Sequence, residues 1–143
     1  MEQAVEAKPG AVHFVHVMKT GGTSFVARAR SLFAEGEVWP RIESGDRLGE
    51  GLYGDAGRLR DLTDHERRTV RFFAGHHPFV ATELSGAATT MTVLRDPVDR
   101  TISVLRHLRR HDPSLADLAL EQVYDDIWKR AMFIWEDQVR QFA

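Results

Sequence analysis

The chain has 143 residues, 43% of them hydrophobic and 28% charged, which is typical of one globular domain with a single core. Its formal net charge of −2 excludes a general basic surface for nucleic acid. It contains no cysteine, which excludes disulfide bonds, thiolate metal sites and a cysteine nucleophile. No apolar run approaches the about 20 residues of a membrane span and the first residues lack the pattern of a signal peptide, so we expect a cytoplasmic protein.

The first predicted element is a buried β-strand over residues 11–18, which follows a loose polar lead-in over residues 1–10. The strand is predicted from its run of apolar, β-branched and aromatic residues, interrupted only by two histidines. A tight turn with one lysine and two glycines then leads into a helix. The residues of this turn and of the first helical turn are Lys19, Thr20, Gly21, Gly22, Thr23 and Ser24.

This strand–turn–helix segment has the features of an anion-binding loop. The helix is predicted to start at an N-cap, Thr23 or Ser24, and to run to about Ala34 with Gly36 as its C-cap. Glycines allow close backbone approach, the first N–H groups of a helix have no partner within it, and the ammonium of Lys19 adds positive charge. Together they predict a site for an anion such as a phosphate group, and we call residues 19–24 the anion loop. The alternative is an ordinary strand-to-helix turn that binds nothing.

The later elements are predicted from hydrophobic periodicity and from turn and capping residues. Further strands are expected over residues 38–40, 69–74 and 89–94. Helical segments are expected over residues 56–62, 64–68, 80–84 and 123–142. Two more are expected, one from Pro97 to Pro113 and one that begins after Ser114. The predicted caps are Thr63 or Asp64 for the segment over 64–68, Asp96 for the helix at Pro97, and Ser114 for the helix that follows it. A long glycine-rich loop is expected over residues 42–57.

Two of these helices carry specific predictions about the core. The helix after Asp96 is predicted to bury a stripe of Val98, Ile102, Leu105 and Leu108 and to leave its arginines on the other face. In the last segment, Trp128 and Trp135 are seven residues apart and are predicted to lie in the core.

Strands that alternate with helices predict an α/β fold. Its architecture is expected to be a three-layer, P-loop-like parallel sheet flanked by helices, in a single domain over residues 11–143. Ligands of such sheets bind beyond the carboxyl ends of the strands. Three of the predicted strands end at polar residues, namely Lys19, His76 with His77, and Arg95. We therefore expect these three groups to meet at one edge of the sheet.

A second anion contact is predicted where the third of these strands ends. Arg95 ends the strand and Ser103 lies eight residues later, about two turns into the next helix. A guanidinium and a hydroxyl group together can bind a phosphate group, because the arginine fork matches two oxyanion oxygens. The alternative is that Arg95 caps a neighbouring helix and that Ser103 is a small packing residue.

Histidine is the third candidate group. His76 follows a strand end beside the anion loop, and an imidazole with a pKa near neutrality suits a general base that takes a proton from a hydroxyl group. The neighbouring His77 should point to the other face of the strand, so one metal ion would rarely bind both, and we expect no metal site. His13 and His16 lie on opposite faces of the first strand and are interpreted as core or supporting residues.

Several of these segments resemble the sulfotransferases that use 3′-phosphoadenosine 5′-phosphosulfate (PAPS). Residues 17–24, Val-Met-Lys-Thr-Gly-Gly-Thr-Ser, resemble the loop that binds the 5′-phosphosulfate, and residues 93–103 resemble the 3′-phosphate segment, an R-D-P-x-x-R-x-x-S pattern. Residues 73–79 resemble the Gly-His stretch of the uronyl and heparan 2-O-sulfotransferase branch, and residues 136–143 resemble a helix of its bacterial members.

The resemblance implies a role for each candidate residue. Lys19 would contact the oxygen that bridges sulfur and phosphorus, and the backbone amides from Thr20 to Ser24, with the hydroxyl groups of Thr23 and Ser24, would hold the 5′-phosphate. Arg95 and Ser103 would hold the 3′-phosphate. His76 would accept the proton of an acceptor hydroxyl group, expected to belong to a saccharide, and no metal would be needed. Because branches of the family differ in their base, His77 and Glu83 are alternatives.

The resemblance also leaves other classes of protein open. Members of the family are usually longer, and we expect the chain to lack their C-terminal part, which makes a non-catalytic nucleotide-binding module an alternative and favours self-association through exposed apolar surface. A P-loop kinase is the other alternative. It is disfavoured because the glycines follow Lys19 instead of preceding it, and because a strand ends at Arg95 where a magnesium-binding acid would be expected.

Overall fold

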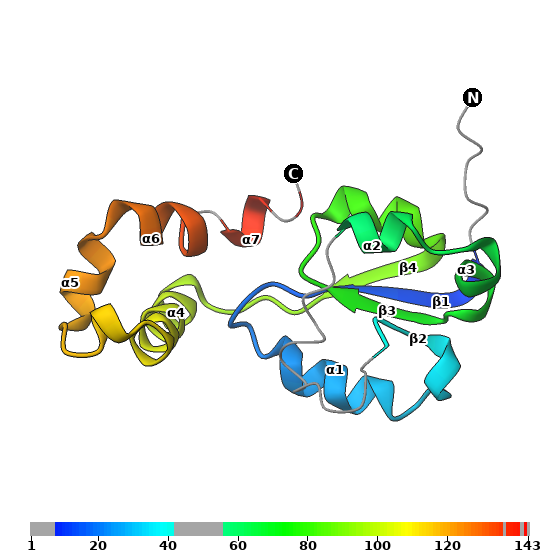
Figure 1. Cartoon of the computed structure of the whole chain (residues 1–143), viewed down its shortest axis with the longest axis horizontal. Helices are drawn as coiled ribbons and strands as arrows, with labels where there is room; N and C mark the ends of the chain where they lie inside the picture. The colour runs from blue at the N-terminus through cyan, green and yellow to red at the C-terminus, as the bar shows by residue number, and fades with distance from the viewer. Residues whose placement is uncertain (1–7, 42–55, 136, 141, 143) are drawn as a thin grey trace.

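The structure is a computed structural model that describes residues 8–41, 56–135, 137–140 and 142. A parallel four-stranded sheet with the strand order β2-β3-β1-β4 forms its centre. The strands are β1 (Lys8–Val15), β2 (Val38–Trp39), β3 (Phe72–Gly75) and β4 (Ala87–Thr92). Helices lie on both faces of the sheet, which confirms the predicted α/β fold with three layers (Figure 1).

Strand β1 occupies the middle of the sheet because its run of apolar residues can be buried from both faces. It pairs with β3 so that Val15 lies opposite Gly75, and with β4 so that Val15 lies opposite Thr92. The hydroxyl group of Thr92 also donates a hydrogen bond of 2.7 Å to the carbonyl oxygen of Val15. Since all three strands run in the same direction, the loops that follow them leave from one edge of the sheet.

The two faces of the sheet carry separate apolar cores, since successive side chains of a strand point to opposite faces. On one face, Phe14 and Phe72 pack with Val26 of α1 (Gly22–Arg30). On the other face, Phe73 packs with Leu59 of α2 (Ala56–Arg60). Figure 1 shows α1 and α2 on opposite sides of the sheet.

Capping residues define the ends of two of the remaining helices as predicted. Thr63 caps α3 (Asp64–Thr69) in a capping box with Glu66, and Asp96 caps α4 (Pro97–His111) by accepting hydrogen bonds of 3.0 Å from the N–H groups of Val98 and Asp99. The other helical elements are η1 (Glu35–Glu37), η2 (Phe79–Ser85), η3 (Pro113–Leu115), α5 (Leu120–Asp125), α6 (Ile127–Phe133) and α7 (Asp137–Arg140).

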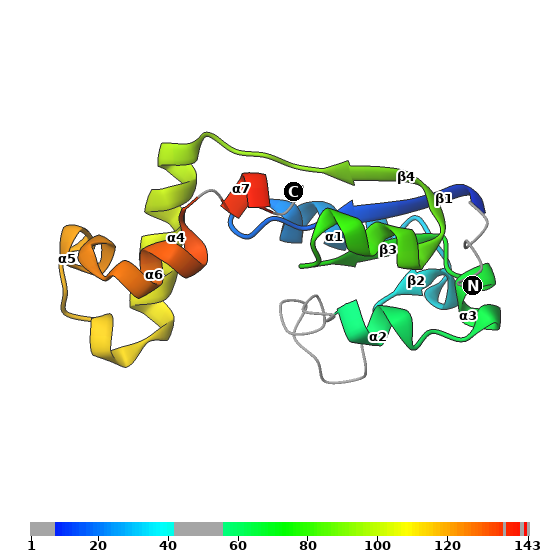
Figure 2. The same cartoon turned by 90° about the horizontal axis from the view of Figure 1, so that it is seen from above.

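Helices α4 to α6 lie beyond the carboxyl edge of the sheet and have their own small apolar core (Figure 2). Arg100 of α4 connects this core to the sheet, although its side chain is buried. Its Nε donates to the carbonyl oxygen of Met18, at 3.0 Å, and its Nη2 donates to the carbonyl oxygen of Phe133, at 2.9 Å. The side chain of Met18 packs against the same helical core. The loop after β1 is therefore held by α4.

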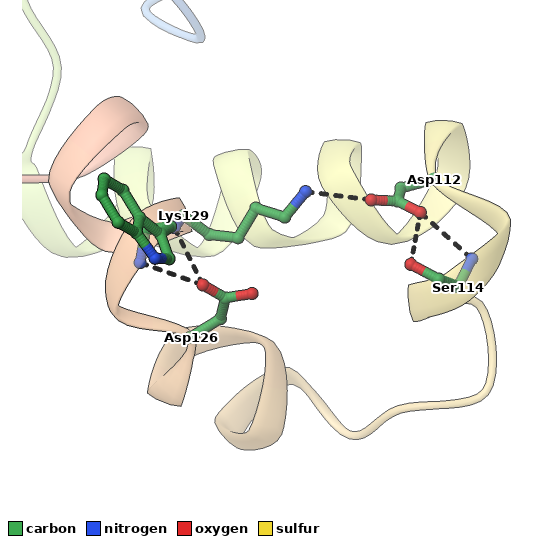
Figure 3. Close-up of polar contacts among 5 residues, drawn as sticks. Asp112, Ser114, Asp126 and Lys129 are labelled. Atoms are coloured by element: carbon green, nitrogen blue, oxygen red, sulfur yellow. Dashed lines mark hydrogen bonds and ion pairs between the residues drawn. The ribbon is translucent and has the colours of Figure 1, made fainter.

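Polar side chains at the helix ends hold the outer part of this layer together (Figure 3). The carboxylate of Asp112 accepts hydrogen bonds from the hydroxyl group of Ser114, at 2.6 Å, and from the ammonium of Lys129, at 2.9 Å. These bonds lower the pKa of Asp112 to about 2, and the bond from Ser114 has the largest effect. Asp126 caps α6 by accepting from the N–H groups of Trp128 and Lys129. The prediction that Ser114 caps the next helix is wrong, since Asp112 caps η3.

Other element boundaries differ from the prediction. Helix α1 ends at Arg30 with Ser31 as its C-cap, and Gly36 lies in η1 instead of capping it. Strand β1 already begins at Lys8. Of the loop predicted over residues 42–57, residues 42–55 lie outside the described residues and the last two belong to α2. Strand β3 begins only at Phe72 because Thr69 still belongs to α3, and Val93 and Leu94 leave the sheet toward α4 after β4 has ended at Thr92.

The core predicted for the C-terminal half is partly wrong. The long helix predicted over residues 123–142 is divided into separate short helices, with Asp126 between α5 and α6. Trp128 is 76% exposed because α6 turns its other face, with Phe133, toward the helical core, and Trp135, which lies after the end of α6, is 47% exposed. Val98 is exposed as well, whereas Leu105 and Leu108 of the predicted stripe are buried, and Arg100 and Val104 are buried beside them. In the described part of the chain, no helix has the length and apolar content to cross a membrane.

We predict that replacing Arg100 lowers stability because two carbonyl groups lose their charged donor. Arg100→Leu should reduce the free energy of unfolding by about 2–4 kcal/mol, measured by urea denaturation. Arg106→Leu, an exposed position on the same helix, should change it by less than about 0.5 kcal/mol. Equal effects of the two substitutions would contradict the role assigned to Arg100.

Candidate functional site

The loop between β1 and α1 adopts a backbone conformation that suits an anion. Lys19 has a φ of 65°, the one positive φ among the non-glycine residues that the structure describes, and Gly21 has a φ of 95°. Gly21 is the N-cap of α1, so the predicted caps Thr23 and Ser24 are wrong. The two left-handed residues turn the chain so sharply that the helix begins two residues earlier than its hydroxyl side chains suggest.

The first turn of α1 presents N–H groups and hydroxyl groups at this loop. The first hydrogen bond of the helix runs from the N–H of Phe25 to the carbonyl oxygen of Gly21, at 3.5 Å, so the N–H groups of Gly22, Thr23 and Ser24 precede it. The side chains of Thr23 and Ser24 are exposed. The hydroxyl group of Thr20 is buried and donates to the carbonyl oxygen of Val17 at 2.9 Å, which stabilises the loop.

Basic side chains from two other segments gather around Lys19. Burial and then the positive charges of Arg110 and Arg95 lower the pKa of Lys19. Burial and then Lys19, His111 and Arg110 lower the pKa of His107, whose ring lies 4.3 Å from that of His111. We call Lys19, Arg95, His107, Arg110 and His111 the basic cluster. Among the described residues, none of its members has an ion-pair partner. Such a concentration of positive charge favours the binding of an anion.

The positions on α4 explain how the basic cluster forms. Ser103, His107 and Arg110 follow each other at spacings of four and three residues and share one face of α4. Ser103 is half-buried on this face. Arg95 lies just before α4, and its backbone exchanges two hydrogen bonds with the side-chain amide of Gln138, at 3.0 and 3.1 Å. This exchange connects α7 to the segment between β4 and α4 (Figure 2).

The candidate base lies in a stack of two imidazole rings. The ring of His76 lies 4.4 Å from the ring of His16, with 21° between their planes. His16 is buried, whereas His76 is partly exposed at the carboxyl edge of the sheet. The Cδ2–Nε2 edge of His16 in turn lies against Gly22, where a Cβ atom would come within 2.2 Å of Cδ2. The stack therefore connects the candidate base to the first residue of α1.

The structure places the two alternative bases differently. His77 is fully buried on the opposite face of the sheet, where its ring lies 5.4 Å from Trp39 and 5.7 Å from His13. Glu83 is exposed on η2. This geometry favours His76, since it is the histidine of the pair that shares a face with α1.

His13 belongs to the core, and its Nδ1 lies 3.0 Å from the hydroxyl oxygen of Ser85. Burial, with a smaller effect of His77, lowers the pKa of His13 from 6.5 to about 4. Burial, with smaller effects of His76 and Lys19, lowers the pKa of His16 to about 4 as well. Both rings are therefore neutral at neutral pH.

Sequence reasoning interpreted His16 as a core or supporting residue, without its stacking on His76, and missed three further residues that the structure brings to this region. They are Arg100, which holds the anion loop, and His107 and Arg110 of the basic cluster. The last two could have been found, since they continue the helical spacing that starts at Ser103. Nothing in the sequence indicated that Arg100 is buried, because its partners are backbone carbonyl groups.

The described residues contain no group of three or more histidine or acidic side chains that could hold a metal ion. Comparisons of the chain with protein-family models, with curated proteins and with solved structures find no match. The ligand of this site therefore has to be inferred from its own geometry and charge.

We predict that the site does not tolerate a side chain at Gly22. Gly22→Ala should reduce the free energy of unfolding by about 1–3 kcal/mol, because the new methyl group overlaps the ring of His16, and it should weaken phosphate binding at the loop. Denaturation and phosphate titration would measure both effects. Gly36→Ala, where nothing lies within 4 Å of the new Cβ, serves as the control and should change neither.

We also predict a loss of stability at acidic pH. The folded protein binds fewer protons at His13 and His16 than the unfolded chain between pH 6.5 and about 4, so the free energy of unfolding should fall as the pH drops through this range. The slope should reach about 1.4 kcal/mol per pH unit for each histidine. His13→Phe should reduce the slope, and His65→Gln, at an exposed position, should not. A slope that His13→Phe leaves unchanged would contradict the assignment.

Proposed function

We propose that the chain is a PAPS-dependent sulfotransferase domain that transfers a sulfuryl group to a hydroxyl group of an acceptor, with a saccharide as the expected acceptor class. One observation carries this proposal. A loop with helix N–H groups and a partly buried lysine lies beside basic side chains that have no ion-pair partner in the part of the chain that the structure describes, and a histidine lies at the same sheet edge. Lys19, Arg95 and His76 each lie in a segment that resembles a motif of the PAPS-dependent sulfotransferases.

The residues present fit a ligand with two separate anionic ends. PAPS has a phosphosulfate group at one end and a 3′-phosphate at the other. The N–H and hydroxyl groups at the start of α1 suit the first, and Arg95 with Ser103 suits the second. Arg110 lies near enough to Lys19 to lower its pKa, so it adds positive charge beside the loop.

The chemistry that these residues support needs positioning and charge neutralisation. When bound, PAPS would supply an activated sulfuryl group for transfer to the acceptor oxygen, with the bridging oxygen keeping the electron pair of its former bond to sulfur. Lys19 would neutralise the charge on this oxygen. His76 would accept the proton of the acceptor hydroxyl group, since it is partly exposed at the sheet edge.

A P-loop kinase is a weaker interpretation of the same loop. Such an enzyme needs a carboxylate for magnesium at the end of a neighbouring strand. Here β4 ends at Thr92, the first charged residue after it is Arg95, and the next residue, Asp96, uses its carboxylate to cap α4. The geometry thus favours binding of the nucleotide by basic side chains.

We predict that the protein binds 3′-phosphoadenosine 5′-phosphate (PAP), the product nucleotide, in preference to ATP with magnesium. Lys19→Ala, Arg95→Ala and Arg110→Ala should each weaken PAP binding by about 10- to 100-fold, because each removes a charged contact or a nearby positive charge. Isothermal titration calorimetry measures these affinities.

The control for this experiment is Arg28→Ala, which removes an exposed arginine from the last turn of α1, away from the loop. It should leave the affinity for PAP unchanged. Stronger binding of ATP with magnesium would support the kinase alternative. A folded protein that binds neither nucleotide would contradict the proposed cofactor site.

A further inference from the structure

The stacking of His16 on His76 follows from the register of the sheet. Val15 lies opposite Gly75 in the parallel pairing of β1 with β3, and the N–H of His16 continues the pairing with a hydrogen bond of 2.9 Å to the carbonyl oxygen of Gly75. The next residues, His16 and His76, are therefore neighbours on the same face. Their rings meet because each follows the last residue of a buried strand.

The surroundings of His16 allow its ring few positions. The side chain is 4% exposed, its ring lies 5.8 Å from that of Phe14, and its Cδ2–Nε2 edge lies against the backbone of Gly22. A Cβ atom at Gly22 would lie 2.2 Å from this edge, so only glycine leaves room for the ring. His16 is thus held between the core and the first residue of α1.

His16 is also unsuited to exchange a proton itself. Burial lowers its pKa to about 4, and the charged groups that face it, His76 and Lys19, act in the same direction. Its Nδ1 is buried and has no hydrogen-bond partner among the described residues. A neutral, confined ring can serve as a rigid support for its neighbour.

We propose that His16 is a positioning residue that holds the imidazole of His76 beside the anion loop. The catalytic part of this inference rests on the proposed function, in which His76 is the base. The structural part does not rest on it. The ring of His16 lies between Gly22, at the start of α1, and the ring of His76, so the position of Gly22 determines the position of the His76 ring.

The first test measures the stack without any reaction. In the spectrum of the full chain labelled with ¹³C-histidine, the Cε1–H resonance of His76, assigned with His76→Gln, should be shifted upfield by the ring of His16. It should also shift again when PAP binds to the loop. His16→Ala should abolish the upfield shift and the response to PAP, whereas His16→Phe should retain the upfield shift because it keeps an aromatic ring in place. His13→Phe, a buried histidine on the opposite face of the sheet, is the matched control and should change neither.

Each result of this test supports or contradicts the proposed support of the His76 ring by His16. An unshifted resonance of His76 in the wild type, or one that His16→Ala leaves in place, would overturn the proposal. If His16→Ala fails to fold, as thermal unfolding followed by circular dichroism would show, His16→Phe still tests the proposal, since loss of the upfield shift in that folded variant would contradict it.

The second test measures transfer of ³⁵S from labelled PAPS to a panel of unsulfated polysaccharides. His16→Ala should lower kcat at least tenfold and leave the KM for PAPS within twofold, and His16→Phe should restore most of kcat. In a double-mutant cycle, His16→Ala should have no further effect on a His76→Ala background. An equal loss on that background, or a loss of PAP affinity instead of kcat, would overturn the positioning role. A wild type that transfers no label while its His76 resonance behaves as expected would contradict the proposed function and leave the structural part supported.

Discussion

The parallel pairing of β1 with β3 on one side and with β4 on the other is the constraint on which the rest of the structure depends. It places the residues that follow Val15, Gly75 and Thr92 at one edge of the sheet, although they are far apart in the chain. The anion loop, the candidate base and the segment with Arg95 all leave from this edge. A change of register between β1 and β3 by one residue would separate His16 from His76 and would exchange the two faces of the strand.

The electrostatics of this edge work against folding. The basic cluster collects positive charges without an ion-pair partner among the described residues, and the strands beside it bury two histidines whose pKa values are lowered to about 4. Positive φ at Lys19 adds strain of about 1–3 kcal/mol. Unfavourable features of this kind persist in binding and catalytic sites, because the bound ligand offsets them. The anion proposed to bind here would supply the missing negative charge.

The helices beyond the sheet are connected to it by polar contacts as much as by apolar ones. Arg100 donates to the carbonyl oxygen of Met18, and Gln138 exchanges two hydrogen bonds with the backbone of Arg95. Because both contacts involve segments of the proposed site, the position of α4 and the shape of the anion loop depend on each other. The outer face of α6 is apolar and exposed at Trp128, and Trp135, just after this helix, is exposed as well, so the apolar residues of this layer exceed what its small core buries.

Local sequence patterns were sufficient to predict the class of fold and some of the element ends. The alternation of buried strands with helices and the Asp96–Pro97 start of α4 are properties of short segments and were predicted correctly, and Thr63 is the one of the two predicted caps that begins α3. The glycine turn after β1 was recognised as well. Its N-cap was placed wrongly, because the left-handed conformation of Lys19 is set by the surrounding loop and not by lysine itself.

The tertiary structure alone decided which of these residues meet. The stack of His16 on His76 depends on a strand register, and the approach of Arg110 to Lys19 depends on the docking of α4. The hydrophobic pattern predicted neither the burial of Arg100 nor the exposure of Trp128. Arg100 is buried because its guanidinium donates to two backbone carbonyl groups, and Trp128 is exposed because the small helical core does not extend to it. Local patterns specify conformation and amphipathic faces, whereas long-range pairing and docking determine what those faces contact.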